Sequence, residues 1–168
     1  NRSPDSNWYW LTITDLSPGV EYAYQYLIDG TLRVADAFTE KILDPSNDRF
    51  IPASTYPNLK PYPMGKTTGI VSILQTAKPA YQWQNNNFVP PANKDLVVYE
   101  LLIRDFIADQ RYSSLIDSLD YLQRLGINCI ELLPIKEFEG NNSWGYNPSF
   151  FLAADKAYGT EYDLRAFI

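Results

Sequence analysis

The 168-residue chain has no histidine, a single cysteine and no cluster of lysine or arginine. Without histidine, it cannot form a Ser-His-Asp triad or a histidine-ligated metal site. Cys129 stands alone in an apolar run, which excludes a disulfide within the chain and indicates a small core residue. The net charge of −6 and the lack of a basic cluster argue against nucleic acid and anionic membranes as partners.

Long apolar runs and cofactor motifs are also missing. No run of about 18 apolar residues occurs, so we expect no membrane insertion. There is no glycine-rich phosphate loop and no nucleotide-binding fingerprint, so we expect no cofactor and no metal. The first ten residues show no signal-peptide pattern, although a signal could lie upstream. We favour a secreted or cell-envelope location over a cytoplasmic one.

Aromatic residues, in contrast, make up 15% of the chain. Tyrosine and tryptophan combine an apolar ring with a polar group, which suits interfaces and sugar rings. The alternative is that a β-rich domain uses these residues as strand formers. For most of them the second interpretation is favoured.

The first 76 residues follow a β pattern. Asp29-Gly30 predicts a tight hairpin turn between two alternating segments. Proline-rich segments around it predict loops along an edge. Only about four strands can be counted, fewer than the seven or so of an immunoglobulin-type sandwich, so the first strands are expected to be missing. The predicted strands are residues 8–16, 20–28, 31–38 and 67–75, and the predicted loops are residues 41–52 and 56–69.

After a Pro/Asn-rich linker, the pattern changes to α/β. Residues 96–103 and 127–135 are continuous apolar runs, typical of strands covered on both faces. Between them, residues 114–126 predict one helix, capped by Ser113 or Ser114 and ended by Gly126. The order predicts a parallel β-α-β unit. A final helix is expected after Thr160, with Asp163 completing a capping box.

Residues 143–151 (SWGYNPSFF) set two large aromatic residues around a glycine and then break the chain at Asn147-Pro148. Such a segment is either a packing plug or a surface for a flat polar ligand. Among the nearby carboxylates, Glu131 lies on the second apolar strand, whereas Asp105, Glu137 and Glu139 follow strand ends. These three are candidates for an acid/base pair, but the favoured interpretation is that they are solvated loop carboxylates. Glu100 and Arg104 are expected to form a structural ion pair.

Three of these segments together resemble the start of the catalytic barrel in the α-amylase family, glycoside hydrolase family 13. They are DLVVYELLIRDF, LDYLQRLGINCIELLPI and SWGYNPSFFLAADKAYGTEYDLRAFI, in this order. The branch they resemble includes branching enzymes, isoamylases and pullulanases. Upstream, LSPGVEYAYQYLIDG and RVADAF are similar to the late strands of the immunoglobulin-like, E-set starch-binding module that precedes such barrels.

The resemblance implies a multidomain β plus α/β fold. Residues 1–76 would be the end of an immunoglobulin-like β-sandwich, residues 77–94 a linker, and residues 95–168 the first β-α-β part of a TIM (β/α)8 barrel. The family cleaves α-glucans by a retaining mechanism with two carboxyl groups about 5 Å apart. Its three acidic residues follow barrel strands four, five and seven, so we expect no catalytic residue in this chain and no activity from the chain alone.

The resemblance also implies a substrate site. In the family, the tyrosine that corresponds to Tyr146 stacks on the sugar ring at the scissile linkage. The alternative is that Trp144 and Tyr146 plug the barrel mouth, and packing is the favoured role for Trp144, Phe150 and Phe151. The expected substrate-binding residues are Trp144, Tyr146 and Asn147, and the expected supporting residues are Glu100, Arg104, Gly145 and Pro148.

Two other functions remain open at this point. The chain could belong to a non-catalytic glycan-binding protein with a degenerate amylase-like barrel, or to an unrelated α/β domain with a β appendage. The two apolar strand runs would also leave apolar surface and an unpaired edge exposed. We therefore expect a homo-oligomer, most simply a dimer, with an α-glucan oligosaccharide or polysaccharide as the ligand.

Overall fold

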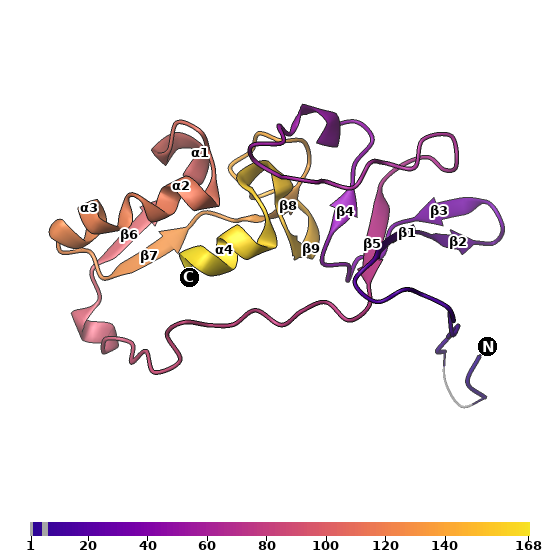
Figure 1. Ribbon diagram of the computed structural model, residues 1–168, viewed down its shortest axis with the longest axis horizontal. Coiled ribbons are helices and arrows are strands. Elements are labelled where there is room, and N and C mark those ends of the chain that lie inside the picture. Colours follow the sequence, from indigo (N-terminus) through magenta and orange to yellow (C-terminus); the bar gives the residue numbers. More distant parts are fainter. Residues whose placement is uncertain (1, 5–6) are drawn as a thin grey trace.

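The computed structural model describes residues 2–4 and 7–168, in two halves joined by a long linker (Figure 1). In the first half, β1 (Glu21–Tyr24), β5 (Val71–Gln75) and β4 (Ile42–Leu43) form an antiparallel sheet in the order β1-β5-β4. A separate hairpin pairs β2 (Tyr26–Ile28) with β3 (Leu32–Val34). This arrangement confirms the β character of the first half.

The hairpin turn is confirmed, since Asp29 and Gly30 both have positive φ, at 50° and 71°. The expected strand over residues 20–28 is instead divided between two sheets at Gln25. The Gln25 side-chain amide donates to the carbonyl oxygens of Thr68 and Ile70, at 2.9 and 2.8 Å, and so fixes the break. The strand expected over residues 8–16 is absent: Tyr9 makes only an isolated bridge to Arg2, and residues 10–16 are in no strand.

Strand β4 lies in a segment that was expected to be a loop. Ile42 and Leu43 are only 2% and 0% exposed, so burial of two apolar side chains offsets the turn-forming residues that follow. After β4 the chain forms the short 3-10 helix η1 (Asp48–Phe50), which approaches the second half of the molecule.

The second half contains the predicted β-α-β unit. The two strands run parallel, with Val98 opposite Cys129 and Leu101 opposite Leu132. Helices lie between them in sequence, and a last helix packs on the same core. The elements are β6 (Val98–Leu101), α1 (Ile103–Phe106), α2 (Tyr112–Ile116), α3 (Leu119–Arg124), β7 (Cys129–Leu132) and α4 (Glu161–Phe167).

The single helix expected over residues 114–126 is broken into α2 and α3. Leu115 and Leu122 are both buried, so the apolar pattern was interpreted correctly, but Asp117 and Ser118 form a turn between them. The expected serine cap is also wrong, because Arg111 is the N-cap and the Ser114 hydroxyl donates to Asp109 at 2.5 Å.

The ends of α3 and α4 confirm the other predicted signals. Gly126 has φ +86° and donates to the Gln123 carbonyl at 2.9 Å, as expected of a glycine just beyond a helix. At α4 the Thr160 hydroxyl accepts from the Asp163 backbone at 3.1 Å, and the Asp163 carboxylate accepts from the Thr160 backbone at 3.0 Å. This is the capping box.

The parallel pair is covered on one face only. Tyr99 and Leu101 pack into the core, whereas Val98 and Glu100 are exposed on the other face. The expectation of strands covered on both faces is therefore wrong for this chain. The open face is where the expected association of copies would occur, and that association stays a prediction.

A second hairpin links the halves. Strands β8 (Lys136–Phe138) and β9 (Pro148–Ala154) pair antiparallel, with two register shifts in β8. Phe150 and Ala153 of β9 pack against Ile42 of β4, so the first half and this hairpin share a buried cluster. In the described part of the chain, no helix is long and apolar enough to cross a bilayer.

A buried lysine lies at the same junction. Lys156, in the 3-10 helix η3 (Lys156–Tyr158), is 2% exposed. Its Nζ lies 2.5 Å from Glu137 Oε1 on β8 and 3.4 Å from Asp48 Oδ1 on η1. Burial alone would lower the lysine pKa, but Glu137, Asp48 and Asp155 together raise it. The cation is therefore held charged between the two halves.

Burial shifts the pKa values of the neighbouring acids in the direction opposite to its effect on the lysine. Burial raises the pKa of Glu137 to about 7 despite the neighbouring Lys156, and it raises the pKa of Asp155 to about 6. Three carboxyl groups lie around one ammonium group, so a single positive charge cannot neutralise all three when they are ionised. The expectation that Glu137 is a solvated loop carboxylate is wrong, because it is 6% exposed on a strand.

We predict that the free energy of unfolding falls as pH rises from about 4.5 to 7. The folded state holds a proton on Glu137 that the unfolded state has released across this window. The loss attributable to Glu137 is at most about 3 kcal/mol, and Glu137→Gln should remove it. Urea denaturation at pH 5 and pH 8 measures both effects. Glu139→Gln, an exposed neighbour, is the control; equal slopes for wild type and Glu137→Gln would contradict the account.

Candidate functional site

The candidate site is the connection between β8 and β9, residues 139–147, here called the aromatic loop. Parallel strands β6 and β7 end at the same edge of their sheet, and the segments that follow both strands meet there. Arg104 on α1 donates from Nη1 to Asn142 Oδ1 of the aromatic loop at 2.9 Å. In a barrel, residues at this edge face the ligand.

Internal hydrogen bonds hold the aromatic loop in shape. The Ser143 hydroxyl donates to Asn147 Oδ1 and accepts from the Gly145 backbone N–H, the latter at 3.0 Å. The Asn141 side chain donates to the Asn47 carbonyl at 2.8 Å, which ties the loop to the first half. Sequence reasoning missed Asn141 and Ser143; short polar residues beside a glycine were the available signal.

Gly145 is the residue that the loop geometry requires. It has φ +86°, and a Cβ at this position would lie 2.0 Å from the Pro134 carbonyl oxygen. The loop backbone thus rests directly on the segment that follows β7. Pro148 begins β9 and fixes its own φ, so the exit from the loop is also restricted.

The two aromatic side chains of the loop point outward. Trp144 is 63% exposed and Tyr146 is 67% exposed. In this structure neither side chain is a packing plug, and the expectation that Trp144 packs is not met. Packing was also expected of Phe150 and Phe151: Phe150 is only 9% exposed, as expected, whereas Phe151 is 59% exposed and does not meet the expectation. Asn147, expected at the substrate, accepts a hydrogen bond from the Ser143 hydroxyl through its side-chain Oδ1, and its contact with a substrate stays a prediction.

The carboxylates near this edge do not form an acid pair. Asp105 is exposed, and the hydrogen bond from Arg104 holds the pKa of this carboxyl below its usual value. The ion pair expected between Glu100 and Arg104 is replaced, within the described residues, by Arg104–Asp105 at 2.7 Å. The physical reason is placement: Glu100 lies on the open face of β6, whereas Arg104 lies on α1 beside Asn142.

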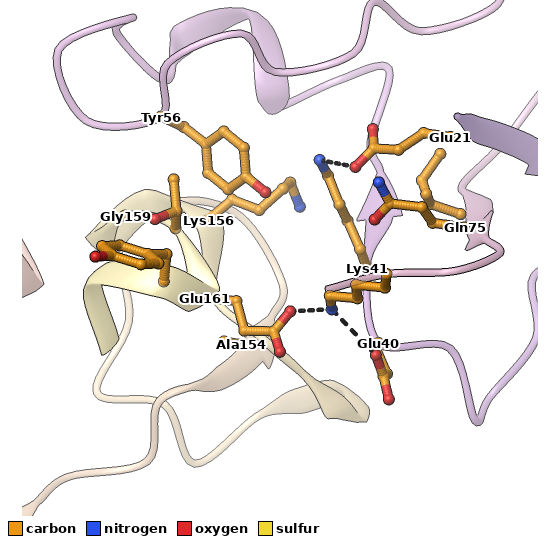
Figure 2. A pocket seen from close by; sticks show the side chains of 13 residues that line it. Glu21, Glu40, Lys41, Tyr56, Gln75, Ala154, Lys156, Gly159 and Glu161 are labelled. Atoms are coloured by element: carbon orange, nitrogen blue, oxygen red, sulfur yellow. Dashed lines mark hydrogen bonds and ion pairs between the residues drawn. The ribbon is translucent and has the colours of Figure 1, made fainter. Parts of the chain in front are cut away.

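A cavity of about 200 Å³ lies between the two halves, away from the aromatic loop (Figure 2). Its three lysines are matched to acidic groups: Lys41 to Glu21 at 2.8 Å, Lys78 to Glu40 and Glu161, and Lys156 to Glu137. Across residues 2–4 and 7–168, no three His, Cys, Asp or Glu side chains gather as metal ligands would. This cavity is an ionic interface between the halves.

The chain was compared with proteins of known name and with solved structures, and several of them match most of its length. Malto-oligosyltrehalose trehalohydrolase from Saccharolobus solfataricus is 31% identical over 155 residues, covering 92% of this chain and 23% of the relative. Isoamylase 1 from Arabidopsis thaliana is 32% identical over 83 residues, covering 45% of this chain and 11% of the relative. The crystal structure of an amylase-like protein from Salmonella typhimurium superposes with a TM-score of 0.66 at 26% identity, covering 91% of this chain and 22% of that chain.

Over most of its length the chain is similar to members of the α-amylase family, glycoside hydrolase family 13. No family model matches it. It spans about a quarter of the length of the curated relatives it matches. The matched span includes the aromatic loop and both halves, so the amylase-like assignment covers most of the chain rather than a single motif.

We predict that Gly145→Ala distorts the aromatic loop and lowers the thermal midpoint. The added methyl group would clash with Pro134 and would strain a positive φ, at a combined cost of about 2–3 kcal/mol. Gly140→Ala is a matched control, because Gly140 has φ +80° but no atom within 4 Å of the place that an added methyl group would take. Thermal unfolding followed by circular dichroism compares them; equal losses would show that the Pro134 contact is unimportant.

Proposed function

We propose that this chain is part of an α-glucan-active glycoside hydrolase or transglycosylase. Residues 1–76 would be the end of an immunoglobulin-like module, residues 77–94 a linker, and residues 95–168 the first part of a (β/α)8 barrel. The antiparallel sheet of the first half and the parallel β6–β7 pair support this division. The relatives' names support the substrate class, since isoamylase acts on α-glucans.

The observation that carries the proposal is the exposed pair Trp144 and Tyr146 on a fixed loop. A pyranose ring has an apolar face, which an exposed aromatic ring covers at little entropic cost when its backbone is already in place. Gly145 holds the backbone against Pro134, so the two rings extend from a rigid base. In the proposal, Tyr146 stacks on a sugar ring of the substrate and Trp144 contacts a neighbouring part of the glucan.

The catalytic step belongs to other residues in this proposal. A retaining glycosidase needs two carboxyl groups about 5 Å apart, one of them kept protonated. Among the described residues the protonated candidates, Glu137 and Asp155, surround Lys156 between the halves rather than the aromatic loop. The chain alone is therefore expected to bind glucan and to release no reducing sugar from starch, glycogen or pullulan.

We predict that maltoheptaose shifts the Trp144 indole N–H signal in nuclear magnetic resonance spectra of the ¹⁵N-labelled chain. Trp144→Phe identifies that signal. Tyr146→Ala should weaken the titration about tenfold, or ~1.4 kcal/mol, because one stacking surface is lost. Since Tyr146 is exposed, the thermal midpoint should stay within about 2 °C.

The opposite pattern would contradict the proposed site. An unmoved Trp144 signal, or a Tyr146→Ala chain that binds normally but unfolds early, would assign the aromatic loop to packing. Reducing sugar released by the purified chain above a buffer blank would contradict the placement of the catalytic acids elsewhere. Trp10, outside the aromatic loop, supplies a reference indole signal in the same spectra.

A further inference from the structure

A second aromatic surface lies where the linker crosses the last helix. Residues 78–84 of the linker and Glu161, Tyr162 and Arg165 of α4 line a groove of about 580 Å³, here called the linker groove. This volume is in the range of ligand sites in proteins. The linker groove shares no residue with the aromatic loop, and neither the fold nor the proposed substrate site explains it.

Three aromatic rings form one wall of the linker groove. The Tyr81 ring centre lies 5.0 Å from that of Trp83 and 5.4 Å from that of Tyr162, both in edge-to-face geometry. Tyr81 is thus the shared neighbour that holds the outer two rings in place. Trp83 remains 47% exposed and Tyr162 67% exposed, so both offer ring surface to a ligand.

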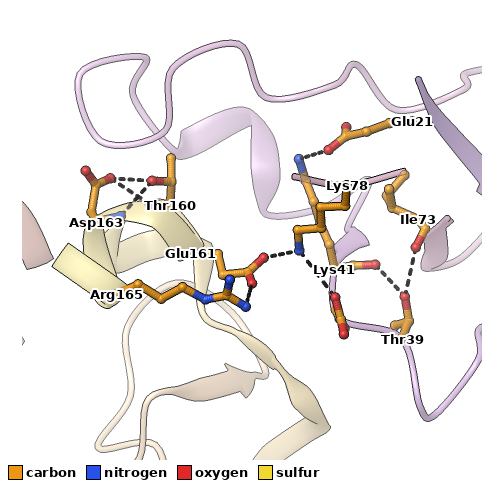
Figure 3. Close-up of polar contacts among 10 residues, drawn as sticks. Glu21, Thr39, Lys41, Ile73, Lys78, Thr160, Glu161, Asp163 and Arg165 are labelled. Carbon is orange, nitrogen blue, oxygen red and sulfur yellow. Dashed lines mark hydrogen bonds and ion pairs between the residues drawn. The ribbon is translucent and has the colours of Figure 1, made fainter. Parts of the chain in front are cut away.

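The charged groups at the linker groove balance one another (Figure 3). Lys78 pairs with Glu161 and with Glu40, and Glu161 also pairs with Arg165 on the next turn of α4. Glu40 lies outside the lining of the linker groove, but because it pairs with Lys78 the two cations are matched by two anions. A groove without net charge does not select an anionic or a cationic ligand.

The remaining polar groups suit hydroxyl groups. Gln82 and Gln84 each carry an amide that can both donate and accept hydrogen bonds. Aromatic surface, amide groups and balanced charge together fit a neutral, polyhydroxylated ligand with apolar faces. A sugar chain has this chemistry, whereas an apolar helix or a phosphorylated ligand does not.

We propose that the linker groove is a second glucan-binding site, in which Trp83 and Tyr162 contact the sugar rings of an α-glucan chain. The identity of the sugar rests on the proposed function of the chain; the groove itself fits the wider class of neutral sugars. Because its residues come from the linker and from α4, the site holds glucan independently of Trp144 and Tyr146.

The indole N–H signals of Trp83 and Trp144 test the two sites separately. Trp83→Phe and Trp144→Phe assign the signals, and maltoheptaose is titrated into the ¹⁵N-labelled chain. We expect a saturable shift at Trp83. Tyr162→Ala should weaken the titration seen at Trp83 about tenfold and leave that at Trp144 unchanged. Tyr121→Ala, an exposed tyrosine on α3, is the matched control and should change neither titration.

Each other outcome overturns the proposal. If Trp144 shifts and Trp83 does not, the linker groove is no glucan site and the proposed function stands. If Trp83 shifts but Tyr162→Ala has no effect, the ligand does not occupy the linker groove. If cellohexaose, a β-linked glucose chain, shifts Trp83 equally, the assignment to α-glucans is wrong. If neither signal moves, both proposals are wrong.

Discussion

The buried charge of Lys156 is the constraint on which the two halves of the molecule depend. An ammonium group removed from water costs several kcal/mol unless carboxylates replace its hydration. Asp48 on η1 supplies one, at 3.4 Å, and Glu137 on β8 supplies the other, at 2.5 Å, once the pH exceeds its raised pKa of about 7. Since Asp48 comes from the first half and Glu137 from the second, separation of the halves would leave a buried charge without part of its compensation. The shared cluster of Ile42, Phe150 and Ala153 adds apolar burial at the same junction.

The position of the aromatic loop follows from this junction. Asp155, directly after β9, accepts a hydrogen bond from the Phe138 backbone at the end of β8, at 3.1 Å. This hydrogen bond holds the two strands together beside Lys156, so the aromatic loop between them is fixed at both ends. Gly145 then brings that loop onto Pro134. The rigid base of Trp144 and Tyr146 thus depends on the charged groups around Lys156, which lie outside the aromatic loop.

Local signals in the sequence were sufficient for much of the fold. The Asp29-Gly30 turn, the parallel β6–β7 pair, the glycine after α3 and the capping box at Thr160 were all predictable, because each depends on neighbouring residues or on a single apolar run. Tyr146 was chosen through family resemblance rather than through physics alone; its ring is exposed, and its contact with a substrate stays a prediction.

Features that depend on distant partners were not predictable. Glu137 resembled a solvated carboxylate, because its partner Lys156 lies 19 residues away and becomes a neighbour only in the folded hairpin. That hairpin was missed because Pro148 was interpreted as a break, although proline is tolerated as the first residue of a strand. Gln25 divides one alternating segment into two strands through carbonyl groups more than 40 residues away.

The central claim is that these contacts make the two halves one cooperative unit. Scanning calorimetry of the wild-type chain at pH 8, where Glu137 and Asp155 are ionised, tests it directly, because a two-state transition requires equal calorimetric and van't Hoff enthalpies. The account predicts a single transition with equal enthalpies. Two separable transitions, one for the antiparallel half and one for the parallel half, would contradict it.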